Sequence, residues 1–498
     1  MAPINYPAID MDNKIKMVFP RECVYKNPDL YDIFVGRNLP SFVKDWMVKC
    51  FTQEENFDRD SCLSFINAKI PAKGMGLRKR LLHSSAPIQI FSRLIIHTDL
   101  LHGKTGFSIP DLGIGHKEGI VSQNMAQSKI EHLHEGEVWG ILTLTYKKPQ
   151  LNISGYVELT DFRPFEPYRV ELDYFLAARE KFTTLEWIDL LIRSMEVNPN
   201  YVDPERKLSF NLTRKLTMLS RLLVHVEPNL NLIELAPKGT GKSYVFNNLS
   251  KYGWTVSGGI VSRAGIFYNL STKTPGIIHN YDFLALDEVE TIQFANDEDI
   301  QGAFKNYLEN GRIVVGQYKN VSDCGLMLLG NISLTRQMRP KHEDFFMQLP
   351  KFFHSSALVD RIHGFIPGWI LFRFTEDLKL KGYALNTEYF SEIMHLLRNQ
   401  TESGQIVQEA LQIPKNADTR DTRAVIKLCT AYLKLLFPHA RSILEIDPNE
   451  FQDYILTPAL RSRAIIRKQL AVMDCEFSPE MPEIKLQESY LASKRQVS

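Results

Sequence analysis

The feature that most constrains how this chain folds is an apolar run that leads directly into a loop containing two glycines. Residues 232–236 read Leu-Ile-Glu-Leu-Ala, and residues 236–243 continue as Ala-Pro-Lys-Gly-Thr-Gly-Lys-Ser. Gly239 and Gly241 lack a Cβ, so the backbone there can curl and present its N–H groups to an anion. The helix expected from Tyr244 onward turns its positive end toward the same point. A strand, such a loop and a helix in this order predict an α/β nucleotide-binding sheet.

The side chains of this loop indicate a nucleoside triphosphate and a divalent metal. We expect Lys242 to reach the β- and γ-phosphates of ATP and Ser243 to offer its hydroxyl to Mg²⁺. The usual pattern begins with glycine where this chain has Ala236, so the loop alone is a weak signal. The residues predicted to bind the nucleotide are Pro237, Lys238, Gly239, Thr240, Gly241, Lys242, Ser243 and Tyr244.

Two further strands end in polar residues of the types that ATP hydrolysis requires. Residues 283–288 read Phe-Leu-Ala-Leu-Asp-Glu, which places Asp287 on the metal and Glu288 where it can deprotonate water. Residues 326–331 form an apolar run ending in Asn331, the expected sensor that holds the attacking water. The order of phosphate loop, acidic strand and amide-tipped strand is that of AAA+ ATPases. Three unrelated strands with polar ends are the alternative, which this order disfavours.

Length and composition limit the classes of protein to consider. With 498 residues the chain has room for two or three domains, and its net charge of +1 does not by itself indicate a nucleic-acid partner. No run approaches the ~20 apolar residues of a membrane span, and the N-terminus does not resemble a secretory signal. We therefore expect a cytoplasmic protein without a membrane partner. The six cysteines are scattered without a Cys-x-x-Cys pair, which argues against zinc and disulfides.

Changes in periodicity divide the chain into three predicted domains. Between residues 106 and 159, short alternating strands broken by glycines indicate a small β-barrel of the oligonucleotide-binding (OB) type. A proline-marked stretch at 161–167 ends this N-terminal domain, which is predicted to span 1–167 and to bind DNA. We place linker helices and the α/β AAA+ core at 168–380, and a helical lid with the C-terminal tail at 381–498.

Two short strands around residues 316–319 predict a β-hairpin just before the strand that ends in Asn331. In a ring ATPase such a hairpin projects into the central pore, where Lys319 would meet DNA phosphates. Arg312 and Tyr318 are the other residues expected to contact DNA. An ordinary surface turn is the alternative.

Two positions carry arginines of the kind that ring ATPases commonly use. Arg361 follows the sensor strand, where an arginine finger reaches the γ-phosphate bound by the neighbouring subunit. Asp360 and Arg361 are expected to open a strand toward the nucleotide end, and a salt-bridged surface Arg361 is the alternative. Arg420, or as second choice Arg423, precedes an amphipathic helix where a second sensor arginine is expected. The alternative is that each of these two arginines is only a solvent-exposed residue at the start of a helix.

Three weaker features have plain alternatives. His132 and His134 have metal-like spacing, but no third ligand is evident, so metal binding is disfavoured. Two basic groups would suit a phosphate backbone but are as readily explained as solvated charges. They are Lys73, Arg78, Lys79 and Arg80 in a glycine-containing loop, and Arg461, Arg463, Arg467 and Lys468 in a C-terminal helix.

Together these motifs resemble the Lon-like AAA+ family of BREX phage-defence systems, the BrxL family. The similarity rests on residues 182–191, 231–243, 360–363 with 367–369, and 421–425, and extends over most of the chain. The resemblance implies an N-terminal DNA-binding region, a homo-oligomeric ring (a hexamer or a double ring), and a core similar to minichromosome maintenance (MCM) helicases. The hairpin around Lys319 is similar to their pre-sensor hairpin. Longer members carry a C-terminal Lon-protease-like domain, for which the short tail after residue 480 leaves no room, so no protease active site is expected.

The expected function is that of an oligomeric ATPase that couples ATP hydrolysis to binding or translocation of double-stranded DNA in BREX-type defence. Other defence-system proteins are candidate partners. The alternative is a protein unfoldase without its own protease domain, which would grip polypeptide through aromatic residues. Phe267 and Tyr268 are the nearest candidates for that role. A nucleotide-gated scaffold without catalysis is disfavoured by the acidic pair of Asp287 and Glu288.

Overall fold

The computed structural model describes residues 10–37, 39–53, 56–71, 76–84, 86–99, 103–128, 136–150, 154–295 and 297–493. Contacts divide the chain into two compact units, Pro28–Arg169 and Val170–Ser498 with Met1–Asn27. Each unit has its own hydrophobic core. His132, His134 and Lys73, which the sequence singled out, lie outside the described residues.

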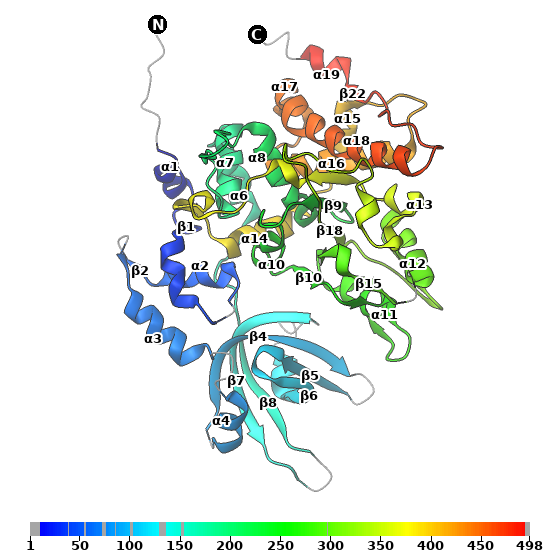
Figure 1. Cartoon of the computed structure of the whole chain (residues 1–498). Coiled ribbons are helices and arrows are strands. Elements are labelled where there is room, and N and C mark those ends of the chain that lie inside the picture. Colours follow the sequence, from blue (N-terminus) through cyan, green and yellow to red (C-terminus); the bar gives the residue numbers. More distant parts are fainter. Residues whose placement is uncertain are drawn as a thin grey trace. The chain divides into compact units, whose positions relative to one another are not determined.

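The smaller unit is built around a closed five-stranded barrel with the strand order β4-β5-β6-β8-β7 (Figure 1). The strands are β4 (Ile88–Asp99), β5 (Lys104–Ile109), β6 (Ile114–Val121), β7 (Gly136–Lys147) and β8 (Tyr156–Pro164). β6 and β8 run parallel, and the other neighbours are antiparallel. Alternate residues point inward, so Leu94, Phe107 and Leu142 are fully buried inside the barrel.

Short helices surround this barrel, and aromatic rings join one of them to it. The helices are η1 (Pro28–Phe34), α2 (Ser41–Cys50), α3 (Arg59–Lys69), α4 (Leu77–His83), η2 (Pro110–Leu112) and α5 (Gln123–Ser128), with a small hairpin of β2 (Thr52–Gln53) and β3 (Asn56–Phe57). Trp46 of α2 stacks on Phe91 of β4 with ring centroids 5.8 Å apart. Phe165, just beyond β8, meets Trp46 edge to face at 5.1 Å. Such ring pairs stabilise packing beyond the area they bury.

The larger unit contains the expected α/β core, a five-stranded sheet in which every neighbouring pair is parallel. Its strands are β9 (Asn231–Ala236), β10 (Gly253–Ser257), β14 (Phe283–Asp287), β18 (Gly325–Asn331) and β19 (Gly364–Pro367), in the order β10-β14-β18-β9-β19. β18 lies between β9 and β14, although it follows both in the chain. The carboxyl ends of the three motif strands therefore lie side by side at one edge, which is where open parallel sheets bind ligands.

Helices cover both faces of this sheet. On one face, residues of α12 (Asp297–Asn310), α13 (Ser356–Val359) and α18 (Thr457–Met473) pack with Ile233, Leu284 and Leu328. On the other face, Phe246 of α10 (Lys242–Asn248) and His225 of α9 (Leu223–Val226) pack on Phe283. The strands are buried on both sides, which explains why they are almost continuously apolar in sequence.

The first described residues belong to the larger unit, whereas the sequence placed them in the N-terminal domain. β1 (Cys23–Lys26) pairs antiparallel with β20 (Gly382–Leu385). α1 (Met11–Val18) is fastened by an ion pair of 2.7 Å between Lys14 and Glu186. The pairing of β1 with β20 joins segments some 360 residues apart, so no local sequence pattern indicates it.

Further helices of the larger unit precede and follow the strands of the sheet in the chain. Before β9 come α6 (Leu172–Arg179), α7 (Thr184–Ser194), α8 (Leu212–Leu219) and η4 (Ser220–Leu222). Thr183 and Glu186 form a capping box at the start of α7. The C-terminal helices are α14 (Thr387–Leu397), α15 (Glu402–Ala410), α16 (Thr419–Leu436), α17 (Pro448–Glu450), a π-helical turn η12 (Phe451–Leu456), α18 and α19 (Glu488–Ser493). Among the described residues, none of the helices has the length and apolar character needed to cross a bilayer.

Candidate nucleotide site

The phosphate loop is a stiff turn between β9 and α10. Gly239 and Gly241 have φ angles of 83° and 73°, in the left-handed region that favours glycine. A Cβ on Gly241 would lie 2.9 Å from the ring of Phe374, and the Phe374 N–H donates to the Gly239 carbonyl at 2.7 Å. Gly241 is thus required both by its backbone and by a neighbouring ring. The loop backbone is held in a shape that can receive an anion.

A buried ion pair is hydrogen-bonded to the backbone of this loop. Arg221 and Glu234 are both completely buried and form two hydrogen bonds, of 2.9 Å from Nε and 2.6 Å from Nη2. Arg221 Nη1 also donates to the Thr240 carbonyl at 3.1 Å. The pair was not predicted; its only sequence signal is a glutamate inside an otherwise apolar strand.

The structure brings Lys242 and Asn331 into direct contact. Lys242 Nζ donates to Asn331 Oδ1 at 2.8 Å, and the Lys242 side chain is almost fully buried. The Asn331 amide in turn donates to Glu290 Oε1, and its backbone N–H approaches Glu290 Oε2 at 3.3 Å. Glu290 was missed from the sequence, although it is the third acid in the run Asp-Glu-Val-Glu. Together they form a chain Lys242–Asn331–Glu290 that fixes the orientation of the Asn331 amide.

The two acids that end β14 are held differently. Asp287 is buried, and its Oδ1 accepts a hydrogen bond of 2.9 Å from the Glu288 N–H. Glu288 is exposed and has a φ of 52°, a conformation uncommon for a residue with a side chain. The turn at Glu288 therefore leaves the Glu288 side chain exposed to solvent, whereas the Asp287 side chain stays buried at the end of β14.

The residues present fit a magnesium ion that arrives with a nucleotide. Among the described residues, no group of three or more His, Cys, Asp or Glu side chains forms a metal site by itself. Mg²⁺ is commonly bound by one or two carboxylates together with phosphate oxygens and water. Ser243 in the first turn of α10 and Asp287 at the end of β14 supply that kind of donor set.

Tyr244 is directed toward a second polar group. Its hydroxyl donates to Glu196 Oε2, and Lys26 Nζ approaches the other oxygen of Glu196 at 3.3 Å. Glu196 itself has a φ of 65°. The predicted contact of Tyr244 with nucleotide therefore stays a prediction, while its hydroxyl links α10 to the segment after α7.

Arg361 lies at the opposite edge of the sheet from the phosphate loop. It precedes β19, which runs parallel to β9 with Gly364 beside Leu232, so Arg361 is at the amino ends of the strands. Six residues of β9 at about 3.3 Å each place it roughly 20 Å from the loop of its own protomer. β19 therefore does run toward the nucleotide end, as predicted, but Arg361 lies before its start and does not reach the loop of its own protomer. The role of Arg361 as an arginine finger for a neighbouring subunit stays a prediction.

Arg420 and Arg423, the candidate second sensors, lie beside Arg361 rather than beside the phosphate loop. All three guanidinium groups approach Glu309, with N–O distances of 3.0 Å from Arg361, 3.4 Å from Arg420 and 3.2 Å from Arg423. Arg420 also pairs with Asp360 at 2.7 Å. The surface group formed by Arg361, Arg420, Arg423 and Glu309 is called the arginine cluster below.

The C-terminal helix uses its arginines mainly for internal pairing. Arg463 is completely buried and pairs with Asp360 at 2.8 Å and with Asp421 at 2.6 Å. Arg467 pairs with the second oxygen of Asp421 at 2.7 Å. These two residues are structural, which removes them from a basic surface on this helix.

The predicted hairpin is present as β16 (Arg312–Val315) and β17 (Tyr318–Val321). Arg312 lies opposite Val321, and Lys319 lies opposite Val314, so these four exposed side chains share one face. Tyr318 alternates with Lys319 and lies on the other face, where it stacks on Tyr268 with centroids 3.7 Å apart. The hairpin thus offers a face with two basic residues, while Tyr318 is used for packing.

Tyr268 belongs to a second small hairpin, of β12 (Tyr268–Asn269) and β13 (Thr274–Pro275). Its neighbour Phe267 is completely buried against Phe304 and Tyr307. Neither aromatic side chain is exposed in a way that would let it contact a polypeptide substrate.

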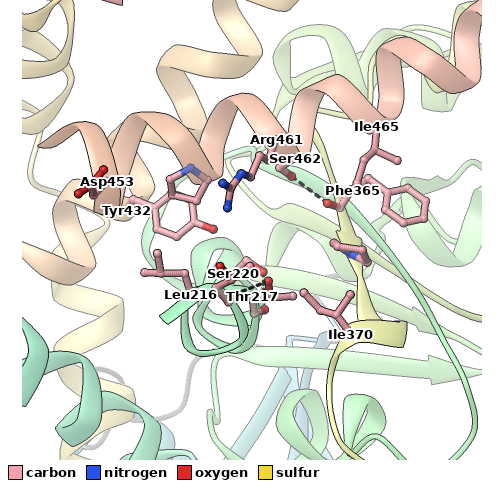
Figure 2. Close-up of a pocket in the computed structure, with 13 residues that line it drawn as sticks. Leu216, Thr217, Ser220, Phe365, Ile370, Tyr432, Asp453, Arg461, Ser462 and Ile465 are labelled. Carbon is pink, nitrogen blue, oxygen red and sulfur yellow. Dashed lines mark hydrogen bonds between the residues drawn. The ribbon is translucent and has the colours of Figure 1, made fainter. Parts of the chain in front are cut away.

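A cavity of about 100 Å³ lies at the carboxyl end of β19, between α8 and the helices α16 and α18. Figure 2 shows Leu216, Thr217 and Ser220 on one side of it and Arg461 and Ser462 on the other. Ser462 Oγ donates to the Phe365 carbonyl at 3.0 Å, which links α18 to β19. β19 and β18 flank β9 on opposite sides, so this cavity lies away from Asn331 along the sheet edge.

A parallel sheet whose central strands end in a glycine turn, an acidic pair and an amide joined to the loop lysine defines a P-loop ATPase domain. The family model described as "Lon-like protease BrxL-like, ATPase domain" matches residues 157–483. A second, "BREX system Lon protease-like protein BrxL N-terminal", matches residues 17–146. The chain belongs to the BrxL family of Lon-like ATPases found in BREX systems.

Two relatives named "Lon-like protease BrxL" resemble the chain over most of its length. The one from Bacillus cereus (strain H3081.97) is 29% identical over 344 residues, which are 69% of this chain and 49% of the relative. The one from Escherichia coli O9:H4 (strain HS) is 27% identical over 357 residues, 72% of this chain and 49% of the relative. The matched region spans about half the length of these curated relatives.

Proposed function

We propose that this protein is an oligomeric ATPase that couples Mg²⁺-dependent ATP hydrolysis to binding or movement along double-stranded DNA in BREX-type defence. The observation that carries the proposal is the hydrogen bond of 2.8 Å between Lys242 and Asn331. It joins the phosphate loop to the sensor strand, with the acidic strand β14 on the far side of that strand. Three motifs that are distant in the chain thus form one hydrolytic site.

Each residue of this site has a distinct task in hydrolysis. The N–H groups of the loop and Lys242 bind the β- and γ-phosphates, and Lys242 exchanges its contact with Asn331 for the γ-phosphate. Glu288 takes a proton from the attacking water, which the Asn331 amide orients. Ser243 and Asp287 would hold a Mg²⁺ ion, which would supply positive charge to the phosphate oxygens. Glu290 keeps the Asn331 amide in the orientation that water requires.

The position of Arg361 supports assembly of several subunits. An arginine about 20 Å from its own phosphate loop cannot stabilise charge there, but it can reach a site on a neighbouring copy. Arg420 and Arg423 share that edge, so all three arginines are proposed to act on the neighbour's nucleotide. Head-to-tail contacts of this kind close into rings when the rotation between subunits allows it.

Two features support a nucleic-acid partner. The barrel's strand order, with its first three strands in sequence and a parallel contact between β6 and β8, is that of OB-type barrels that bind oligonucleotides. The hairpin with Arg312 and Lys319 on one exposed face comes just before β18, as in MCM-like helicases, and suits a phosphate backbone. The C-terminal helices are proposed to serve as the AAA+ lid.

The cavity of Figure 2 is proposed to accept the nucleotide base. Asn331 and Asp287 mark the γ-phosphate side of the loop, on the β18 side of β9. The base must extend in the other direction, toward β19. The cavity's apolar wall (Phe365, Ile370) and hydroxyl groups (Thr217, Ser220) suit a flat, polar-edged ring.

The experiment that tests this function is ATP turnover with and without double-stranded DNA, for the wild type and for Glu288→Gln. We expect DNA to accelerate the wild type, and Glu288→Gln to bind ATP but not hydrolyse it. Acceleration by an unfolded polypeptide alone would favour the unfoldase alternative instead. The burial of Phe267 and the stacking of Tyr268 already argue against that alternative, because they leave no exposed aromatic grip at this hairpin.

A further inference from the structure

The arginine cluster carries more positive charge than its carboxylates balance. Arg361, Arg420 and Arg423 surround the single carboxylate of Glu309 at 3.0–3.4 Å. Asp360, which also pairs with Arg420, is shared with the buried Arg463. A dianion such as a terminal phosphate would therefore be a better partner for these guanidinium groups than one carboxylate.

The ion pair between Glu309 and Arg361 is close but poorly aligned. Glu309 Oε2 and Arg361 Nε are 3.0 Å apart but lack the alignment of a hydrogen bond. Both atoms are buried, and neither takes part in any other hydrogen bond of the described residues. Burial and then the nearby Arg420 lower the pKa of Arg361, against the pull of Glu309 and Asp360. Like charges are thus crowded around an imperfect partner, an arrangement that an incoming anion can replace.

A short and stiff connection joins Glu309 to the hairpin. Glu309 lies in the last turn of α12, and only Asn310 and Gly311 separate it from Arg312, where β16 begins. The Gly311 N–H donates to the Tyr307 carbonyl at 2.7 Å, and the Ser322 N–H donates to the Gly311 carbonyl at 2.9 Å. Gly311 has a φ of 72°, and a Cβ there would lie 2.3 Å from the Ser322 carbonyl oxygen. Both strands of the hairpin are therefore fixed to the last turn of α12.

We propose that Glu309 is a positioning residue that withholds Arg361, Arg420 and Arg423 from the neighbour's phosphate until DNA displaces the hairpin. DNA that moves the basic face of the hairpin moves the last turn of α12 with it, because the Gly311 junction has little freedom. The Glu309 carboxylate then leaves the arginines, which bind the neighbour's γ-phosphate instead. This role rests on the proposed function, since it requires both contact between subunits and DNA on the hairpin.

The test compares ATP turnover by the full chain, with and without double-stranded DNA, for the wild type, Glu309→Gln and Glu309→Asp. Removing the charge should raise the basal kcat to the DNA-stimulated level, so the stimulation ratio falls to about one with KM nearly unchanged. Glu309→Asp keeps the charge and should restore part of the DNA dependence. Glu483→Gln, an exposed acid with its own lysine partner, is the matched control and should behave as the wild type.

The outcomes separate this inference from the function on which it rests. If DNA accelerates the wild type and the Glu309→Gln variant by the same ratio, the role proposed for Glu309 is overturned and the proposed function stands. If the Glu309→Gln variant is slow both with and without DNA, its carboxylate is needed to align the arginines. That result also overturns the withholding role of Glu309. A wild type indifferent to DNA contradicts the proposed function and, with it, this coupling. Thermal unfolding of each variant shows whether a lost rate reflects lost folding.

Discussion

Asn331 is held on both sides, and that makes its amide orientation a property of the folded chain. Lys242 donates to the side-chain oxygen of Asn331, and the side-chain nitrogen of Asn331 donates to Glu290, so the amide cannot rotate. In the proposed function a γ-phosphate draws Lys242 away, and Glu290 remains to fix the amide. A sensor must distinguish the presence of one phosphate, and a side chain with a single fixed orientation does so more sharply than a mobile one.

Glu290→Gln should lower kcat about tenfold, equivalent to about 1.4 kcal/mol, with little change in KM for ATP. Glutamine offers one acceptor where two N–H groups of Asn331 need one each, so the sensor amide turns away from the water. Steady-state kinetics measure both constants, and Glu483→Gln, at an exposed acid paired with Lys485, is the control. An increase in KM with kcat unchanged would show that Glu290 acts on binding instead.

Arg463 illustrates a buried charge whose loss should destabilise the protein. It is completely buried and pairs with Asp360 and Asp421, which would keep their charges without it. Arg463→Met should lower the free energy of unfolding by about 3–5 kcal/mol, measured by urea denaturation. Arg461→Met, two residues earlier and exposed, should change it by less than about 0.5 kcal/mol. Equal losses in the two variants would mean that helix packing, and not ion pairing, sets the stability here.

At the scale of elements, the hairpin of β16 and β17 has one exposed basic face and one packing face. Arg312 and Lys319 are on the exposed face. Arg312→Ala and Lys319→Ala should each weaken DNA binding and reduce the slope of log affinity against log salt by about one. Fluorescence anisotropy with double-stranded DNA across a salt series measures this. Lys485→Ala, an exposed lysine remote in sequence, is the control, and an unchanged slope in both hairpin variants removes this face from the DNA site.

α14 introduces a pH-dependent contribution to stability. Glu388 is buried beside Lys251 at 2.9 Å, and burial raises its pKa from 4.5 to about 7, because desolvation outweighs the lysine. A raised carboxyl pKa means that the folded chain holds a proton that the unfolded chain has lost, so this contribution is present below about pH 4.5 and is lost as the pH rises through 7.

Glu388→Gln removes that titration. From pH 5 to pH 7, the free energy of unfolding of the wild type should fall relative to this variant by about 1–3 kcal/mol. Urea denaturation at several pH values measures the difference. Burial lowers the pKa of His225 to about 3, which gives the opposite slope, but His225 is present in both proteins and cancels. A constant difference across this range would show that Glu388 stays ionised when the chain is folded.

The sequence indicated the elements that carry local signals and missed what depends on distant contacts. The strands ending in Asp287 and Asn331, the phosphate loop and the hairpin were all predicted, because each is a contiguous pattern. Glu290 could not be predicted, because its role exists only when β18 lies beside β14. The edge on which Arg361 lies follows from the direction of β19 relative to β9, which no local motif contains.

At the scale of the whole molecule, the separation of the phosphate loop from the arginine cluster decides how activity depends on assembly. The loop is at the carboxyl edge of the sheet, and the cluster is at the amino edge of the same sheet. Helices and strands this well packed do not bend to bring the two edges together. If Arg361 contributes to hydrolysis, a second copy of the chain must supply it.

Mixing two inactive variants tests this dependence on assembly. Lys242→Ala removes the proposed phosphate contact, and Arg361→Ala removes the proposed finger, so each variant alone should be nearly inactive. In an equal mixture, about one interface in four joins an intact loop to an intact arginine, and about a quarter of the wild-type rate should return. Lys242→Ala mixed with the double variant Lys242→Ala/Arg361→Ala offers no such interface and should stay inactive. A mixture that also stays inactive, although size-exclusion chromatography shows the subunits exchanging, would place the action of Arg361 within its own protomer, against the direction of β19.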